Sequence, residues 1–428
     1  MKGVGMVMDN SAAPGMQLPW AGKQVSPEHV EVELSTLWRL AADNMRISQN
    51  MNVRTSVLNF VICAQDEKTA RKASAVLRDL ASTHIARVTL LILDTRSDGP
   101  SEVSTWITLR SFPIISDIMR HHFEQVTATV GGKAIQYVDN IVQSLLKPDL
   151  PVYLWWLNDL PEDHDIFHRL IKLSSRVIID SSHFTQPEEQ ISAASAILQQ
   201  APQCALSDLT WGRVTAWREL IAQFFDIPEY RPYLMAVDTI SIEHIVATSS
   251  QALDHHSSQK NPIRALLLAA WLKTRLGWKL SEDESDNSRD PVTGTYSWHM
   301  SERDMNKVVT QPLSAITSGE QKTSAPLGGI RISVQPRELV KSAPGTLCLV
   351  RMVCTVEGKQ AIFTIERGDD DDHVLTSVEV PGSPRPPRTV SIAATHKESD
   401  LLHNELEIMG RDRLYEQMLH EVFALLAE

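Results

Sequence analysis

The stretch DLPVYLWWL, residues 149–157, decides the fold class of this chain. Pro148 and Pro151 prevent a helix from running through its start, and the remainder is a continuous apolar run. A strand that is buried on both faces has this pattern. Because neighbouring side chains on a strand point to opposite faces, Trp155 and Trp156 both require cover, most simply from helices. The stretch therefore predicts a layered α/β domain.

Strand and helix patterns alternate on both sides of this stretch. Residues 57–64 and 88–93 form apolar strand patterns separated by a helical one, and residues 176–180 form another strand pattern after a predicted helix. Such alternation predicts a mainly parallel sheet with helices on both faces over residues 26–280. Within that range, residues 106–109 and 123–130 are expected as short strands, and residues 234–245 as a strand pair or an edge strand.

The composition changes on either side of this domain. Residues 1–25 lack periodicity and are expected to form a flexible N-terminal arm, whereas residues 281–329 are polar and predict a linker or surface loop. Four alternating segments and a final helical pattern predict a smaller C-terminal α+β domain over residues 330–428. Its antiparallel sheet is expected to be covered by one closing helix, residues 401–426.

Charge and length restrict the function classes. The 428 residues contain 41 Lys and Arg against 53 Asp and Glu, a formal net charge of -12. Such a charge repels nucleic acid and anionic membranes, so proteins or small molecules are the expected partners. The longest apolar helical run, residues 265–272, is far shorter than the roughly 20 residues of a membrane span, and no signal pattern opens the chain. We therefore expect a cytoplasmic protein that binds neither nucleic acid nor membrane.

Two strand ends resemble catalytic or phosphate-binding loops without completing the pattern. Residues 130–133, VGGK, lie between a strand and a helix, but Thr127 stands where a phosphate loop requires glycine and Ala134 where it requires Ser or Thr. Residues 180–183, DSSH, supply an acid, serines and a histidine. Since a Ser-His-Asp triad is assembled in space rather than from consecutive residues, a polar strand end that caps the next helix is the favoured interpretation.

Three other groups favour structural interpretations. The pairs His121-His122 and His255-His256 lack metal-site spacing and are expected to be solvated loop histidines. Residues 369–372, four consecutive aspartates, lack the glycine and distal glutamate of a calcium loop and predict an exposed hairpin tip. Trp211, Trp217 and Arg218 lie at helical spacing, which is more typical of a core than of a binding face. No catalytic, cofactor or metal residue is predicted.

The cysteines leave two interpretations open. The chain has four cysteines and no CxxC, so a structural disulfide framework is not expected. Cys348 and Cys354 lie six residues apart in one predicted strand, a separation of roughly 20 Å, and can form a disulfide only if that strand bends or unravels. They are either two small buried residues on one face or a redox switch.

Several motifs, taken in order, resemble one known family. Residues 149–156 (DLPVYLWW) and 175–181 (SRVIIDS) are followed by residues 208–213 (DLTWGR), Ala216-Trp217-Arg218, Phe225-Asp226 and residues 271–278 (WLKTRLGW). The motif series resembles the glucose-6-phosphate dehydrogenase assembly protein family, OpcA. The resemblance covers residues 54–280, and the C-terminal region is similar to the family's second region.

The resemblance implies a protein without catalysis of its own. Such a protein binds glucose-6-phosphate dehydrogenase, promotes its active oligomer and activates it allosterically. Cyanobacterial members are associated with thioredoxin-dependent redox control, which makes Cys348 and Cys354 the candidate redox residues and thioredoxin a second candidate partner. The alternative is an enzyme that handles a sugar phosphate, such as a lactonase or isomerase, with the strand-end loops near Gly131 and Ser181.

Overall fold

The computed structural model divides into two compact units. The first unit comprises Met1–Leu157 and His168–Ser174, and the second comprises Asn158–Phe167 and Ser175–Glu428. The residues that the structure describes are 22–48, 51–53, 56–80, 86–95, 99–115, 119–160, 165–246, 261–281, 287–303, 329–339, 342–368, 370, 372–382, 385–392 and 397–427.

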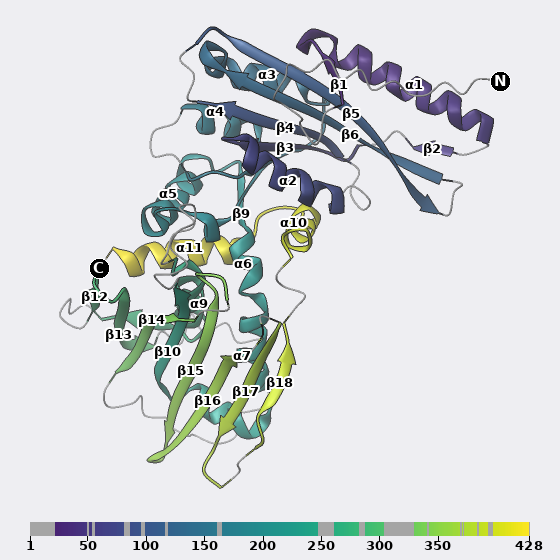
Figure 1. Ribbon diagram of the computed structural model, residues 1–428. Helices are drawn as coiled ribbons and strands as arrows, with labels where there is room; N and C mark the ends of the chain where they lie inside the picture. The colour runs from purple at the N-terminus through teal and green to yellow at the C-terminus, as the bar shows by residue number, and fades with distance from the viewer. Residues whose placement is uncertain are drawn as a thin grey trace. The chain divides into compact units, whose positions relative to one another are not determined.

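The first unit is a mainly parallel sheet with helices on both faces (Figure 1). Its elements are β1 (Lys23–Val25), α1 (Val30–Ser48), β2 (Met51–Val53), β3 (Leu58–Ala64), α2 (Glu67–Leu80), β4 (Ala86–Asp94), β5 (Glu102–Ile115), β6 (Met119–Gly131), α3 (Val138–Leu145), β7 (Val152–Trp156) and part of α4 (Asp165–Leu173). The strand order is β1-β5-β6-β4-β3-β7. Strands β3, β4, β6 and β7 run parallel, and β5 is antiparallel to β6.

The opening stretch behaves as predicted. Every residue of β3 is buried, and β7 pairs with β3 so that Val61 lies opposite Leu154. Trp155 and Trp156 are both buried, and Trp155 stacks on Phe60 with ring centroids 6.2 Å apart. A central strand covered on both faces requires this continuous apolar sequence, since no face is left for water.

A buried ion cluster joins helices and sheet in this unit. Arg87 on β4 contacts Glu124 on β6 at 2.9 Å, and both side chains are almost fully buried. Arg87 also pairs with Glu31 of α1, and Lys147 lies 3.1 Å from Glu124. Burial alone would raise the pKa of Glu124, but the charges of Arg87 and Lys147 lower it below its usual value.

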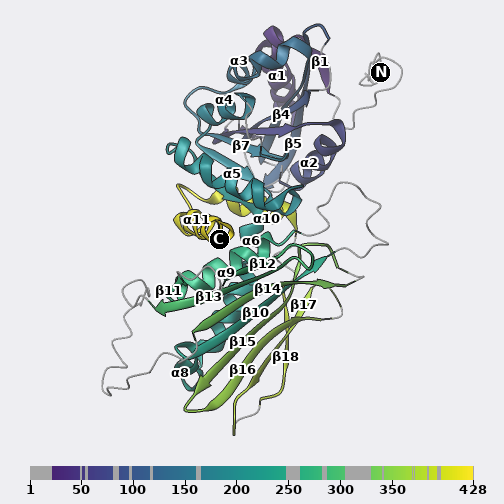
Figure 2. The ribbon, with the colours of Figure 1, turned by 90° about the vertical axis from the view of Figure 1, so that its left-hand side faces the viewer.

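Figure 2 shows α2 on the opposite side of the sheet from α3.

The second unit contains the strand pair β8 and β9 and a mainly antiparallel sheet. Its elements are β8 (Arg176–Ile179), α5 (Pro187–Gln200), β9 (Ala205–Asp208), α6 (Leu209–Arg213), α7 (Thr215–Asp226), α8 (Arg231–Leu234), β10 (Val237–Val246), α9 (Ile263–Arg275), β11 (Trp278–Leu280), β12 (Ser288–Asp290), β13 (Thr295–Arg303), β14 (Ile330–Glu338), β15 (Leu347–Val356), β16 (Lys359–Arg367), β17 (His373–Glu379), β18 (Arg388–Ser391), α10 (Glu398–Glu407) and α11 (Arg413–Leu426). The sheet order is β11-β13-β14-β10-β15-β16-β17-β18, and among the described strands of this sheet only β10 and β14 pair in parallel.

The predicted fold class is confirmed, but the predicted boundary at residues 281–329 does not separate the two units. Strand β10, expected as an edge strand or strand pair of the first domain, is central in the second sheet, between β14 and β15. Strand β13 lies within the segment that was expected to be a polar linker or surface loop. Residues 304–328 of that segment lie outside the described part of the chain. Local polarity cannot show that β10 pairs with strands about 100 residues later, because strand pairing is a non-local choice.

Other expectations require smaller corrections. In the expected N-terminal arm, residues 1–21 lie outside the described part, whereas Lys23–Val25 pairs with β5. The two expected short strands are halves of one long hairpin, β5 and β6. The single closing helix is two helices, α10 and α11, interrupted near Gly410, whose φ of 97° is open to glycine. Helices α7 and α9 lie along the second sheet, while α11 packs on α5 and α9 (Figure 1).

Candidate functional site

The ends of β8 and β9 carry a group of buried, hydrogen-bonded polar side chains in the second unit. We call Asp180, Ser181, His183, Asp208 and Arg213 the strand-end cluster. Because β8 and β9 are parallel, the residues that follow them meet at the same edge, and each strand ends in an aspartate that begins the next helix. The Asp180 carboxylate accepts a bond from the backbone N–H of Ser182, and that of Asp208 from Thr210. Asp180 thus caps the short 3-10 helix Ser181–His183, whereas the longer helix α5 is preceded by Gln186 without a side-chain cap.

Asp180 forms a bidentate ion pair with Arg213. The guanidinium nitrogens Nη1 and Nη2 lie 2.7 and 2.8 Å from Oδ1 and Oδ2 of Asp180. His183 Nδ1 lies 3.2 Å from Oδ2, and the Ser182 hydroxyl donates to Oδ1 at 2.6 Å. Burial alone would raise the pKa of Asp180, but Arg213 and His183 hold it well below its usual value. Asp180 is therefore a buried carboxylate that is charged at neutral pH and compensated by Arg213 and His183.

The Asp208 carboxylate accepts hydrogen bonds from uncharged donors. Its Oδ2 accepts bonds from the hydroxyls of Ser181, at 2.6 Å, and Tyr415, at 3.2 Å. Its Oδ1 accepts the backbone N–H groups of Ser181 and Thr210 at 3.0 and 2.9 Å. Burial and the neighbouring Asp180 charge raise the pKa of Asp208, opposed by these hydrogen bonds. Asn261 joins the cluster by donating to the Ser181 carbonyl at 2.9 Å.

This geometry does not assemble a serine nucleophile. Ser181 is fully buried, and its hydroxyl donates to Asp208 rather than to a histidine. His183 contacts Asp180 and lies 3.4 Å from Ser182, whose hydroxyl is engaged with Asp180. A nucleophilic serine requires its proton to be directed at a base and its oxygen to be open to substrate. The lactonase-like alternative at Ser181 finds no support in this arrangement.

The same strands bind the C-terminal segment of the unit. Arg176 on β8 is buried, donates to the Ser207 hydroxyl and to the carbonyl of Gly410, and contacts the Ile408 carbonyl at 3.1 Å. Trp211 Nε1 donates to Asp412 at 3.1 Å. The partners Ile408, Gly410 and Asp412 lie 201 to 234 residues away in sequence, which is why sequence patterns did not reveal them. Asp208 directly before a helical pattern is a local signal that could have indicated its helix-capping role.

In the VGGK loop, residues 130–133, the backbone at Gly132 packs closely against the backbone at Pro100. Gly132 has a φ of 57°, and a Cβ there would lie 2.2 Å from the Pro100 carbonyl oxygen. A strand-to-helix turn that packs against backbone explains the glycine without a phosphate. The loop thus shows a packing requirement at Gly132 rather than a completed phosphate-binding motif.

The remaining candidate groups are mostly structural. His121 and His122 lie on β6, not in a loop as expected, and His255-His256 lies outside the described residues. Of the aspartate run, the structure describes Asp370 and Asp372, both exposed in the turn between β16 and β17. Across the described ranges, no group of three His, Cys, Asp or Glu side chains is arranged to hold a metal.

The aromatic residues on α6 and α7 belong to the core, as favoured from their spacing. Trp211 and Trp217 are buried, and the Arg218 guanidinium carbon lies 3.5 Å from the Trp211 ring centroid. Burial lowers the pKa of Arg218 to about 10. A stacked cation of this kind fixes the ring orientation and gains the attraction of the π face.

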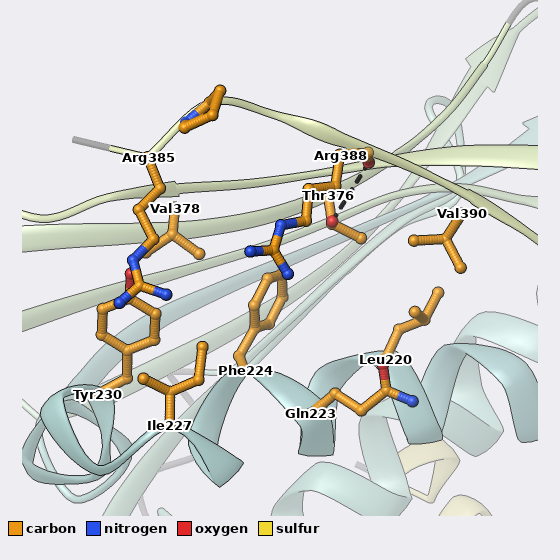
Figure 3. A pocket seen from close by; sticks show the side chains of 11 residues that line it. Leu220, Gln223, Phe224, Ile227, Tyr230, Thr376, Val378, Arg385, Arg388 and Val390 are labelled. Atoms are coloured by element: carbon orange, nitrogen blue, oxygen red, sulfur yellow. Dashed lines mark hydrogen bonds between the residues drawn. The ribbon is translucent and has the colours of Figure 1, made fainter.

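A groove opens between α7 and the β17 and β18 hairpin (Figure 3). It has a volume of about 130 Å³. Phe224 and Ile227 form one wall, and Val378 and Val390 line the sheet side. Arg385 and Arg388 also line the groove, and Figure 3 shows their side chains extending toward Tyr230 and Phe224. Its lining residues on β17 and β18 belong to no motif recognised in the sequence, whereas its α7 residues lie beside Phe225-Asp226.

Comparison with known proteins decides the family. The family described as glucose-6-phosphate dehydrogenase subunit N-terminal domain matches residues 77–196, and the corresponding C-terminal domain family matches residues 204–419. The chain belongs to the OpcA glucose-6-phosphate dehydrogenase assembly protein family. Four of the five residues of the strand-end cluster of this OpcA family member, all except His183, belong to the motifs that carried the resemblance, and their side chains hydrogen-bond to one another and to neighbouring backbone.

Similar curated proteins carry the same family name. The chain is 26% identical over 352 residues to an OxPP cycle protein OpcA of Synechococcus elongatus, an alignment that covers 81% of this chain and 69% of the relative. It is 25% identical over 305 residues to the OpcA of a Synechocystis strain, covering 71% of this chain and 56% of that protein. The chain thus spans between half and three quarters of the length of these relatives.

Among solved structures, an oxidoreductase from Bacillus cereus is similar with a TM-score of 0.43 and 9% identity. That alignment covers 87% of this chain and 96% of the oxidoreductase. At that level of likeness its chemistry does not transfer to the OpcA family member.

No described helix of this chain is long and apolar enough to cross a membrane.

The structure does not bring the two candidate redox residues of this OpcA family member together. Cys348 and Cys354 lie in the continuous strand β15 between β10 and β16, and all four cysteines are free and buried. Burial raises the pKa of Cys348 to about 12, and it raises the pKa of Cys354 further. Since the thiolate is the reactive form, both thiols are unreactive while β15 stays in the sheet.

Proposed function

We propose that this protein binds glucose-6-phosphate dehydrogenase and acts as a non-catalytic assembly partner in the oxidative pentose phosphate pathway. The observation that carries the proposal is the family match to both domains, over residues 77–196 and 204–419. The geometry of Ser181 is consistent with it, because the strongest nucleophile candidate is used as a structural hydrogen-bond donor.

In this proposal, activation results from a population shift. If the protein binds the active oligomer of the dehydrogenase more tightly than other states, it increases the fraction of active enzyme. A strong shift requires several kcal/mol of differential binding, which in turn requires a substantial interface. No chemistry by the bound protein is needed.

The test is an activity assay of the purified dehydrogenase at low concentration, with and without an excess of this protein. We expect a rise in kcat/KM of several-fold at least, together with co-elution on a sizing column and a shift to a larger oligomer. Unchanged activity combined with separate elution would refute the proposal. Heat-treated protein at the same concentration is the control for non-specific stabilisation.

Thiol control is a separate proposal that rests on the resemblance. In it, thioredoxin reduces a disulfide between Cys348 and Cys354 and so changes the affinity for the dehydrogenase. Because both cysteines belong to β15, that disulfide requires β15 to leave β10 and β16 locally. Redox control of this kind therefore acts through partial opening of the second sheet.

A further inference from the structure

The groove between α7 and β18 has the size of an anchor site for a side chain. Its volume of about 130 Å³ is below the range of roughly 300–1,000 Å³ that is typical of sites for cofactors and drug-sized ligands. The lining from α7 and from the sheet is largely apolar, with Phe224, Ile227 and Val378 (Figure 3). A buried apolar side chain of a partner is the kind of group that such small pockets hold in interfaces.

The opening of the groove is basic, although the chain as a whole has a net charge of -12. Arg385 and Arg388 are both exposed, and the Arg385 guanidinium carbon lies 5.2 Å from the Tyr230 ring centroid. Neither arginine forms an ion pair with any residue in the described part of the chain. Two planar guanidinium groups beside an apolar pocket are complementary to carboxylates that flank an apolar residue.

The groove also borders the end of a sheet. Strand β18 is the last strand in the order of the second sheet and pairs only with β17 among the described strands. Its residues are largely exposed, and Arg388 and Val390 of this strand line the groove. An edge strand offers backbone donors and acceptors to an extended peptide, while pockets beside it select alternate side chains.

We propose that this groove binds an extended acidic segment of glucose-6-phosphate dehydrogenase. One apolar side chain of the segment enters the space between Phe224 and Val390, and carboxylates on either side pair with Arg385 and Arg388. The segment adds to the free edge of β18. The inference rests on the proposed function and specifies the surface that carries it.

The test compares binding of purified dehydrogenase to the full-length protein and to two matched double variants. Arg385→Glu with Arg388→Glu reverses the charge at the groove, and Arg351→Glu with Lys359→Glu reverses two exposed charges on β15 and β16. We expect the groove variant to lose affinity by roughly ten- to a hundred-fold and the control to bind within about two-fold of wild type. Circular dichroism and thermal unfolding verify that both variants remain folded.

A third variant tests whether the apolar space of the groove holds a side chain of the partner. Val390 is half-buried in the groove, so Val390→Trp fills the space without adding charge. It is expected to weaken binding as strongly as the charge reversal does. Salt should weaken the wild-type complex more than the complex of the Arg385 and Arg388 variant, because the latter lacks the charge pairs.

The outcomes separate the two proposals. If the wild-type protein does not bind the dehydrogenase, the proposed function and this surface both fail. If wild type binds and both groove variants bind equally well, the assembly role stands and the groove assignment is overturned. Thermal stabilisation by inorganic phosphate or glucose 6-phosphate that disappears in the Arg385 and Arg388 variant, with dehydrogenase binding intact, would assign the groove to a small anion and also overturn it.

Discussion

At the scale of single residues, the polar groups of the strand-end cluster stabilise the fold. Asp180 is a buried carboxylate whose charge is compensated by Arg213 and His183, and Asp208 is satisfied by Ser181 and by Tyr415. A buried charge that loses its partner costs several kcal/mol, whereas the complete pair contributes little over an apolar replacement. Removal of one partner is therefore the informative experiment.

Arg213→Met is expected to lower the free energy of unfolding by about 3–5 kcal/mol at pH 7, because it leaves Asp180 buried and uncompensated. In wild type the depressed pKa of Asp180 contributes stability above pH ~4 that is lost as the pH falls through its folded-state pKa. The deficit of the variant should therefore shrink below pH ~4. Urea unfolding at pH 7 and in acid measures this loss of stability. Arg351→Met, at an exposed position, is the control. A deficit under about 1 kcal/mol at pH 7 would contradict this account.

At the scale of elements, β15 decides how the cysteines behave. From Leu349 to Cys354 the strand is paired on both sides, with Cys354 opposite Ala361 of β16 and Val237 of β10, whereas Cys348 lies at a register break against β10 and before the first residue paired with β16. Two cysteines six residues apart in such a strand are roughly 20 Å apart, well beyond the span of a disulfide. Their reactivity thus reports the opening of the sheet rather than a preformed redox centre.

Native protein is therefore expected to react slowly with a thiol reagent at all four cysteines, because burial disfavours the thiolates. Labelling of Cys348 and Cys354 should accelerate in mild urea together, since both depend on the same strand. Peptide mapping after timed labelling measures this, with Cys63 in the first unit as the reference. Fast labelling of Cys348 alone in native buffer would show that β15 does not protect it.

At the scale of the whole molecule, the second sheet is built from segments far apart in sequence. Strand β10 lies before the polar segment 281–329, whereas its neighbours β14 and β15 lie after it. The fold therefore does not separate at the point where the composition changes. The family match divides the chain elsewhere as well, between residues 196 and 204.

A fragment that ends at Leu280 should not fold like the intact protein. It retains β10 and α9 but lacks both strands that pair with β10 and most of the sheet that α9 covers. Exposed strand edges and apolar helices cause aggregation. We expect the fragment to be aggregated or partly unfolded by sizing chromatography and circular dichroism. A monodisperse fragment with a cooperative unfolding transition would show that residues 26–280 form an independent domain.

The sequence alone indicated the layered α/β class, the buried strand around Trp155 and Trp156, and a structural rather than catalytic interpretation of the DSSH segment. It could do so because burial on both faces and helix capping leave local patterns. The tertiary structure alone decided that β10 is central in the second sheet, that Asp180 pairs with Arg213, and that the α7 and β18 groove exists. These features join residues separated by 33 positions, for Asp180 and Arg213, to 170 positions, for Leu220 and Val390, and such contacts are chosen by packing and charge compensation in the folded chain, not by the local sequence.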